Sequence, residues 1–148
     1  MKVAILMGSP RDAEKMSGAS EMLDRFNVAH EVHVMSAHRA PAQVAELATD
    51  ARANGYGVII CGAGMAAHLA GAVSAHTTLP VIGVPLSGGV GGGMDALLST
   101  VQMPRGIPVA TVAVDGSANA AVLAIEILSV SNAELAERLA TFRDEGAR

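Results

Sequence analysis

His38 and Arg39 carry the most reactive neighbouring side chains of the chain, in the loop Ser36-Ala37-His38-Arg39. An imidazole takes up and releases protons near neutral pH, and a guanidinium is a permanent cation that binds phosphate or carboxylate. Together they predict acid–base chemistry on a phosphorylated small molecule. From this loop alone, a structural histidine beside a solvated arginine is an equally good interpretation.

A second candidate segment, Ser9-Pro10-Arg11-Asp12, opens the first predicted helix. Ser9 suits the N-cap, Pro10 the first helical position and Asp12 the third, so the simplest interpretation is a capping box. The same free N–H groups and the helix dipole can also hold an anion, to which Arg11 would add charge. Because the Asp12 carboxylate would repel a phosphate, we expect it to accept hydrogen bonds from sugar hydroxyls.

The third candidate segment runs from Gly62-Ala63-Gly64 to His68. Its small residues have the spacing of the dinucleotide fingerprint, but no acidic residue follows within twenty positions to hold a ribose. We therefore expect a turn in which bare backbone approaches something small. We place His68 in the first turn of a short helix, where a structural role is as good an interpretation as substrate contact.

Ser87 precedes a segment with five glycines in six positions, Gly88 to Gly93. A flexible connector and a mobile lid over a site are both consistent with this composition. Ser87 and Arg11 are therefore secondary candidates for the site.

These candidate loops must be positioned by strands that alternate with helices. Short apolar runs predict strands, and apolar residues at helical spacing predict the helices between them. The predicted strands are residues 2–7, 30–35, 57–61, 81–84 and 109–114, and the predicted helices are 9–26, 41–53, 66–75, 94–101, 117–130 and 131–145. We expect a capping box at Ser131 and Glu134, and we expect the last helix to pack on a neighbouring subunit.

The alternation predicts an α/β fold, with a doubly wound parallel sheet between two layers of helices in a single domain spanning residues 1–148. Ligands of such sheets bind at the carboxyl ends of the strands. The loops after the first three strands carry Ser9, Asp12, His38, Arg39 and His68. Their predicted convergence at one edge favours an active site over a structural interpretation of His38.

Composition restricts the function further. The net charge is −4, aromatic residues make up 2% of the chain and no basic run occurs, so we expect no nucleic-acid partner. No apolar run is long enough to span a membrane, and we expect a soluble cytoplasmic protein. A hydrophobic content of 51% without such a run favours a homo-oligomer.

Cys61 is expected to be a buried thiol, and no Cys/His spacing predicts a metal site.

Several blocks of the chain, in this order, resemble the PurE family of purine biosynthesis. The blocks are Met7-Gly8-Ser9 with Asp12, Ser36-Ala37-His38-Arg39, Gly62-Ala63-Gly64 with Ala66-Ala67-His68-Leu69, Gly83-Val84-Pro85, and residues 101–108 (VQMPRGIP). Arg11 stands where the family pattern has a serine, Met65 where many members have glycine and Ala70 where many have proline.

The resemblance implies a flavodoxin-like fold in a homo-octamer, acting on N5-carboxyaminoimidazole ribonucleotide without a cofactor. The carboxylate moves from the exocyclic nitrogen to ring carbon four. By resemblance His38 transfers the protons, and Ser9, Asp12 and Arg39 hold the ribose phosphate end. We add Ser36, Gly62, Ala63, Gly64, His68 and Leu69 as expected substrate contacts. The block at 66–69 looks like the mutase branch, which depends on an ATP-dependent synthase to make the carbamate.

Three other functions remain open. A second branch of the same family takes carbon dioxide directly as a carboxylase. A flavin-binding electron carrier shares the fold, but the first loop lacks a Ser/Thr-rich phosphate cradle and few aromatic residues could cover a flavin. A phospho-receiver module needs an acidic pair after the first strand, where Gly8-Ser9-Pro10 stands instead.

Overall fold

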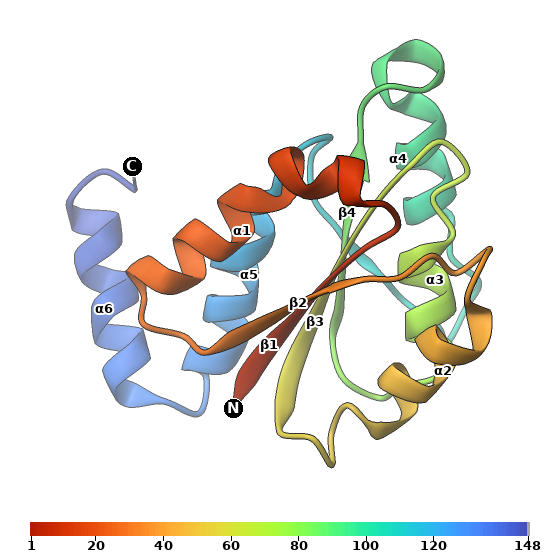
Figure 1. Ribbon diagram of the computed structural model, residues 1–148. Helices are drawn as coiled ribbons and strands as arrows, with labels where there is room; N and C mark the ends of the chain where they lie inside the picture. The colour runs from red at the N-terminus through yellow and green to blue at the C-terminus, as the bar shows by residue number, and fades with distance from the viewer. Residues whose placement is uncertain (148) are drawn as a thin grey trace.

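The computed structural model describes residues 1–147 and contains a five-stranded, all-parallel sheet (Figure 1). The strand order is β2-β1-β3-β4-β5, so the chain reverses its direction of winding between β1 and β3. This order is that of flavodoxin-like folds, which bind ligands at that switch point. The strands are β1 (Lys2–Met7), β2 (His30–Val34), β3 (Tyr56–Gly64), β4 (Val81–Leu86) and β5 (Ala110–Thr111).

Helices cover both faces of the sheet, which gives the three layers predicted from the sequence. Figure 1 shows α1, α5 and α6 on one side and α2, α3 and α4 on the other. Their bounds are α1 (Ala13–Arg25), α2 (Pro41–Asp50), α3 (Leu69–Ser74), α4 (Met94–Val101), α5 (Ser117–Ser129) and α6 (Ala133–Asp144), with short 3-10 turns η1 (Pro10–Asp12) and η2 (Val90–Gly92).

The apolar strands divide their side chains between two cores. In β1, Val3, Ile5 and Met7 pack toward α1 and α5, whereas Ala4 and Leu6 pack toward α2 and α3. Because successive side chains of a strand point to opposite faces, a continuous apolar run is what a sheet covered on both faces requires. Cys61 is buried in the second core, as expected, and burial raises the pKa of its thiol.

The largest corrections to the predicted elements fall at the ends of strands and helices. The predicted strand 109–114 is only two residues long, and the predicted strand 57–61 continues to Gly64. The first helix opens as η1, and the last is capped by Asn132, whose side chain accepts from the Leu135 N–H at 3.1 Å. The Ser131 cap was therefore one residue too early.

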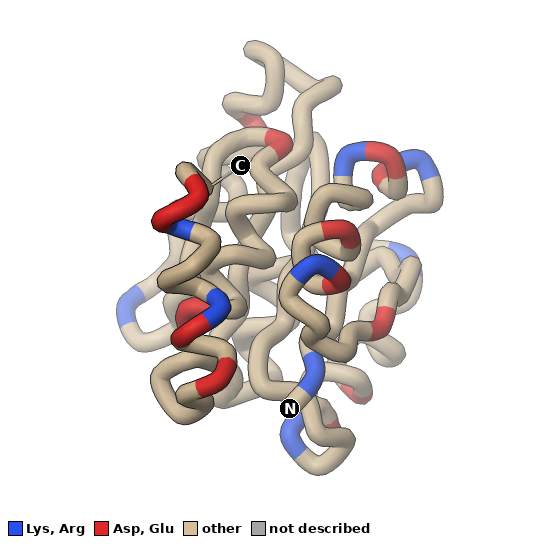
Figure 2. The backbone as a smooth tube through the Cα atoms, turned by 90° about the vertical axis from the view of Figure 1, so that its left-hand side faces the viewer, with Lys and Arg blue, Asp and Glu red and all other residues tan. Residues whose placement is uncertain are grey.

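Helix α6 packs on α5 of its own chain, and its side chains Leu135 and Phe142 are buried in the first core. Its outer side carries charges of both signs (Figure 2), including an ion pair between Arg138 and Glu134. Packing of α6 on a neighbouring subunit stays a prediction. Among residues 1–147, no helix is long and apolar enough to cross a membrane.

Candidate active site

A cavity of about 530 Å³ opens at the carboxyl ends of β1, β3 and β4, at the switch point of the sheet. This volume suits a small-molecule ligand. The structure brings all but one of the predicted site residues together in its lining, namely Ser9, Arg11, Asp12, Ser36, His38, Arg39, Ala63, Gly64, His68, Leu69 and Ser87.

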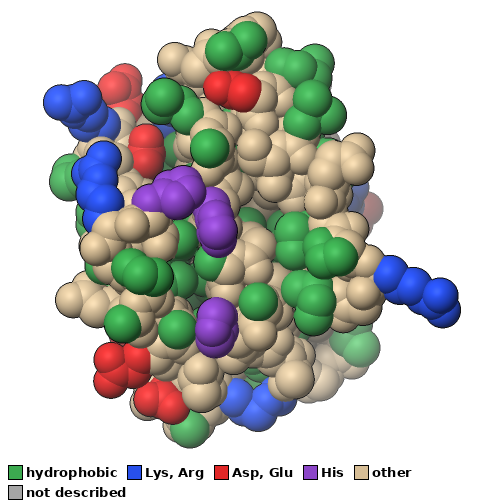
Figure 3. Space-filling view, turned by 90° about the vertical axis from the view of Figure 1, so that its right-hand side faces the viewer, with side chains coloured by type: hydrophobic (Ala, Val, Ile, Leu, Met, Phe, Trp, Pro, Cys, Tyr) green, Lys and Arg blue, Asp and Glu red, His purple; other side chains and the backbone are tan. Residues whose placement is uncertain are grey.

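Two histidines stand together in this cavity. The rings of His38 and His68 meet edge to face, with centroids 5.1 Å apart and planes at 79°. Both side chains are exposed, and Figure 3 shows histidines gathered on this face of the molecule. The sequence predicted His68 in the first turn of this helix. In the structure it lies one position earlier, as the N-cap residue of α3. The pair thus offers two imidazoles to one ligand.

The wall formed by the first loop is a helix cap. The Ser9 hydroxyl accepts from the Arg11 backbone N–H at 3.3 Å, and the Asp12 carboxylate accepts from the Ser9 backbone N–H. Burial raises the pKa of Asp12 above its ordinary value, although the Ser9 N–H and the charge of Lys15 oppose the rise. This segment therefore caps the helix, as expected, and also lines the cavity.

We expect Asp12→Asn to stabilise the fold while it weakens substrate binding. Asn keeps an acceptor for the Ser9 N–H but removes a charge that burial disfavours. Because the folded-state pKa is raised, the carboxylate costs stability as pH rises through its ordinary value of 3.8 and then through the raised value. The gain in melting temperature should be present at pH 7 and vanish below pH 3.8. A lower melting temperature than wild type at pH 7 would contradict the burial argument.

Arg11 and Arg39 are two cations of the cavity that are available to a ligand. Within residues 1–147, neither the Arg11 nor the Arg39 guanidinium has a hydrogen-bond or ion-pair partner, and both side chains are exposed. The turn that presents Arg39 is held by its own backbone, because the N–H groups of Arg39 and Ala40 both donate to the Ser36 carbonyl. Two free guanidiniums beside the N-terminal end of α1 can hold an anion.

Gly62 is the predicted site residue that does not line the cavity. It lies inside β3, and a Cβ atom built on it would come within 2.3 Å of the Met16 sulfur in the core beneath α1. The close approach predicted for this glycine is thus to Met16 and not to a ligand. Ala63 and Gly64 do line the cavity, at the end of the same strand.

We expect Gly62→Ala to destabilise the fold by about 1–3 kcal/mol, as overpacking of a core does, and to leave the KM unchanged. Urea denaturation and steady-state kinetics would measure the two effects. Gly64→Ala is the matched control for stability alone, because its Cβ would meet nothing nearer than the Leu86 carbonyl oxygen at 3.4 Å. If Gly62→Ala instead raised the KM and left the stability unchanged, Gly62 would have to contact the ligand.

Lys15 and Met65 are among the residues of the lining that the prediction missed. Lys15 follows Asp12 by three residues and Arg11 by four, a spacing that places them on one side of a helix and could have identified it. Met65 adopts φ of 55°, a left-handed conformation that glycine takes without strain. This backbone explains why glycine suits the position.

Comparison with known proteins places this geometry in a family. The family model described as AIR carboxylase matches residues 2–148. The chain belongs to this family. It is 50% identical over 147 residues to the N5-carboxyaminoimidazole ribonucleotide mutase of Pyrococcus abyssi, covering 99% of this chain and 84% of that protein. The PurE resemblance predicted from the sequence is thereby confirmed.

Two further similar proteins extend the comparison. The chloroplastic phosphoribosylaminoimidazole carboxylase of Vigna aconitifolia is 48% identical, and the match covers 97% of this chain but 26% of that longer protein. The crystal structure of Treponema denticola PurE superposes with a TM-score of 0.89 at 28% identity, covering 98% of this chain and 90% of that one. The predicted fold class is therefore confirmed.

Proposed function

We propose that this protein is an N5-carboxyaminoimidazole ribonucleotide mutase of purine biosynthesis. The chain is about half identical, over almost its whole length, to a relative that carries this name. The observation that carries the proposal for the site is the cavity, because it brings an imidazole pair and two guanidiniums, unpaired within residues 1–147, together at the switch point of the sheet. That set can transfer protons at one end of a ligand and hold an anion at the other.

In the proposed reaction, His38 donates a proton to the carbamate nitrogen and the N–C bond breaks, which releases carbon dioxide. The enamine-like ring carbon four then attacks this carbon dioxide and forms the new C–C bond. His38 takes the proton that ring carbon four must lose, so the imidazole is restored. One imidazole can serve as acid and then as base, because it takes up and releases protons near neutral pH.

The rest of the lining is assigned by what each group can offer. Arg39 and the Ser9 N-cap bind the phosphate, and the Asp12 carboxylate accepts hydrogen bonds from the ribose. Ser36 and His68 flank His38, whereas Ala63, Gly64 and Leu69 form an apolar wall. An apolar wall helps to retain carbon dioxide and exclude water between the two steps.

The test offers the purified protein N5-carboxyaminoimidazole ribonucleotide in one arm, and aminoimidazole ribonucleotide with bicarbonate in the other. We expect rapid consumption only in the first arm. Consumption in the second arm alone would instead identify a direct carboxylase, the activity in the name of the relative from Vigna aconitifolia. A purified protein that carries a flavin would favour an electron carrier, although no Phe or Tyr lines the cavity in the described part of the chain.

We also propose that the protein is a cytoplasmic homo-octamer, supplied with its carbamate by an ATP-dependent carboxyaminoimidazole ribonucleotide synthase. Large apolar side chains lie exposed on and before α4, including Val90, Met94, Leu98 and Val101. Exposed apolar patches of this kind favour burial against another chain. Native mass spectrometry that found only monomer at micromolar concentration would contradict the oligomer.

A further inference from the structure

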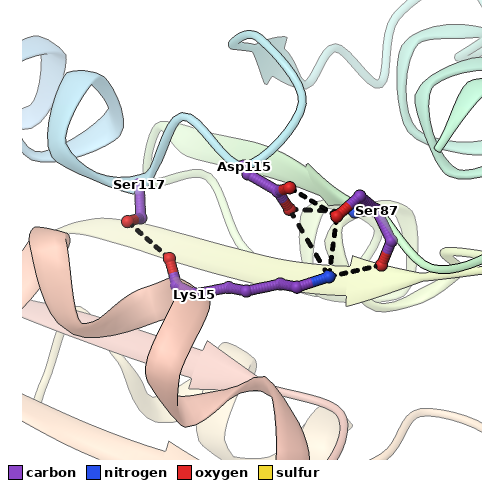
Figure 4. Close-up of polar contacts among 4 residues, drawn as sticks. All are labelled: Lys15, Ser87, Asp115 and Ser117. Atoms are coloured by element: carbon purple, nitrogen blue, oxygen red, sulfur yellow. Dashed lines mark hydrogen bonds and ion pairs between the residues drawn. The ribbon is translucent and has the colours of Figure 1, made fainter. Parts of the chain in front are cut away.

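Lys15, Ser87 and Asp115 form a cluster that joins three segments distant in sequence (Figure 4). Lys15 and Ser87 also line the cavity. The Lys15 ammonium, on α1, donates to the carbonyl and to the hydroxyl oxygen of Ser87, both at 2.7 Å. It also lies 3.9 Å from the Asp115 carboxylate, just before α5. We call this cluster the Lys15 latch.

The hydrogen bonds of the latch fix the orientation of Ser87. Its hydroxyl donates to Asp115 at 2.5 Å, and its backbone N–H donates to the same carboxylate at 2.9 Å. Since a hydroxyl has one proton, Ser87 has none left for a ligand and can only accept a further hydrogen bond. Ser87 therefore does not suit a phosphate oxygen, but suits a hydroxyl or amino group of the substrate.

The backbone of Asp115 supports a specific role for its side chain. Asp115 adopts φ of 58°, a left-handed conformation that costs energy in a residue other than glycine. Its carboxylate makes the contacts that hold Ser87, and Ser117 fastens the same region to α1 through a 2.7 Å hydrogen bond to the Lys15 carbonyl (Figure 4). Asp115, the residue with the strained backbone, is thus the one whose carboxylate holds Ser87.

The latch lies at the start of the glycine-rich segment. Gly88 follows Ser87 directly and has φ of 111°, so the chain turns at this point. Further along, the Val90 backbone N–H donates to the Asp95 carboxylate at 2.9 Å, which holds the middle of the segment to the start of α4. The Ser87–Gly88 wall of the cavity is therefore fixed before any substrate arrives.

We propose that Lys15 and Asp115 are positioning residues that hold Ser87 and the glycine-rich segment in the substrate-binding arrangement. This inference rests on the proposed function for its substrate, but the latch itself is a property of the free protein. Neither residue needs to touch the reacting atoms. Their loss should weaken binding and leave the chemical step nearly intact, because pre-organisation lowers the cost of binding.

The first measurement is hydrogen exchange of the free protein, with peptides that cover residues 87–93. Lys15→Met keeps the length of the side chain but removes its charge and donors, and we expect at least tenfold faster exchange there. Lys2→Met is the control, because Lys2 pairs with Glu31 on the neighbouring strand β2 and does not line the cavity. Unchanged exchange in Lys15→Met would overturn the latch.

The second measurement is steady-state kinetics with the carbamate ribonucleotide. We expect Lys15→Met and Asp115→Asn each to raise KM about tenfold with kcat within threefold, and the double variant to be no worse than either. Lys15→Arg should restore KM. Faster exchange with an unchanged KM would overturn the positioning role. If the wild type does not turn over this substrate, the proposed function fails, while the exchange experiment still decides on the latch.

Discussion

His38→Asn should lower turnover of the carbamate ribonucleotide about a thousandfold or more, within the range that loss of general acid–base catalysis produces. A factor of a thousand corresponds to about 4 kcal/mol of transition-state stabilisation. The fold should be unaffected, because the His38 side chain is exposed and its only ring contact in the described chain is with His68. Substrate affinity should change little, because the proposed phosphate contacts are made by Arg39 and the Ser9 N-cap and not by His38.

Single-turnover kinetics would separate the chemical step of His38→Asn from binding, and a thermal melt would check the fold. His76→Asn is the matched control, since His76 is also exposed but bonds to the Ala72 carbonyl and does not line this cavity. Activity of His38→Asn within tenfold of wild type would show that His38 is not the proton-transfer group. In that case His68, whose ring is the immediate neighbour, becomes the next candidate.

The parts of the fold that follow from local sequence were predicted well. The apolar run of β1 and the helix α4 have the predicted bounds. The strand predicted at 109–114 failed because pairing decides its length. Only Ala110 and Thr111 pair with β4, at the edge of the sheet. Likewise Ala63 and Gly64 look like a turn, yet they extend β3 because Pro85 and Leu86 pair with them on β4.

The features of the site likewise divide into those that the sequence predicts and those that it does not. Parallel strands bring the ends of β1, β2 and β3 to one edge, so the sequence pattern alone predicts that the loops after them lie together. The role of Gly62 could not, because Met16 approaches it from a helix that is distant in sequence. The Lys15 latch depends on residues 72 and 28 positions apart, and no local pattern reports such a contact. In the sequence, Lys15 looks like part of a helix surface, Ser87 like part of a loop and Asp115 like part of a turn.

Arg39→Ala should weaken binding of the phosphorylated substrate by up to about 3 kcal/mol, or roughly a hundredfold, as expected when a charge-assisted, two-pronged contact is lost. Within residues 1–147 the guanidinium has no ion-pair partner, so its removal leaves no buried charge and the melting temperature should hold. Arg39→Lys should recover only part of the affinity, because an ammonium keeps the charge but not the planar fork.

The decisive comparison for Arg39 uses the stable product, 4-carboxy-5-aminoimidazole ribonucleotide, and its nucleoside, which lacks the phosphate. Calorimetry should show that Arg39→Ala loses affinity for the nucleotide but not for the nucleoside. Arg105→Ala is the control, because Arg105 is exposed and lies outside the cavity lining. Equal losses for both ligands would mean that Arg39 binds the sugar or the heterocycle. An unchanged affinity for the nucleotide would assign the phosphate to Arg11, since within residues 1–147 it is the other guanidinium that lines the cavity without a partner.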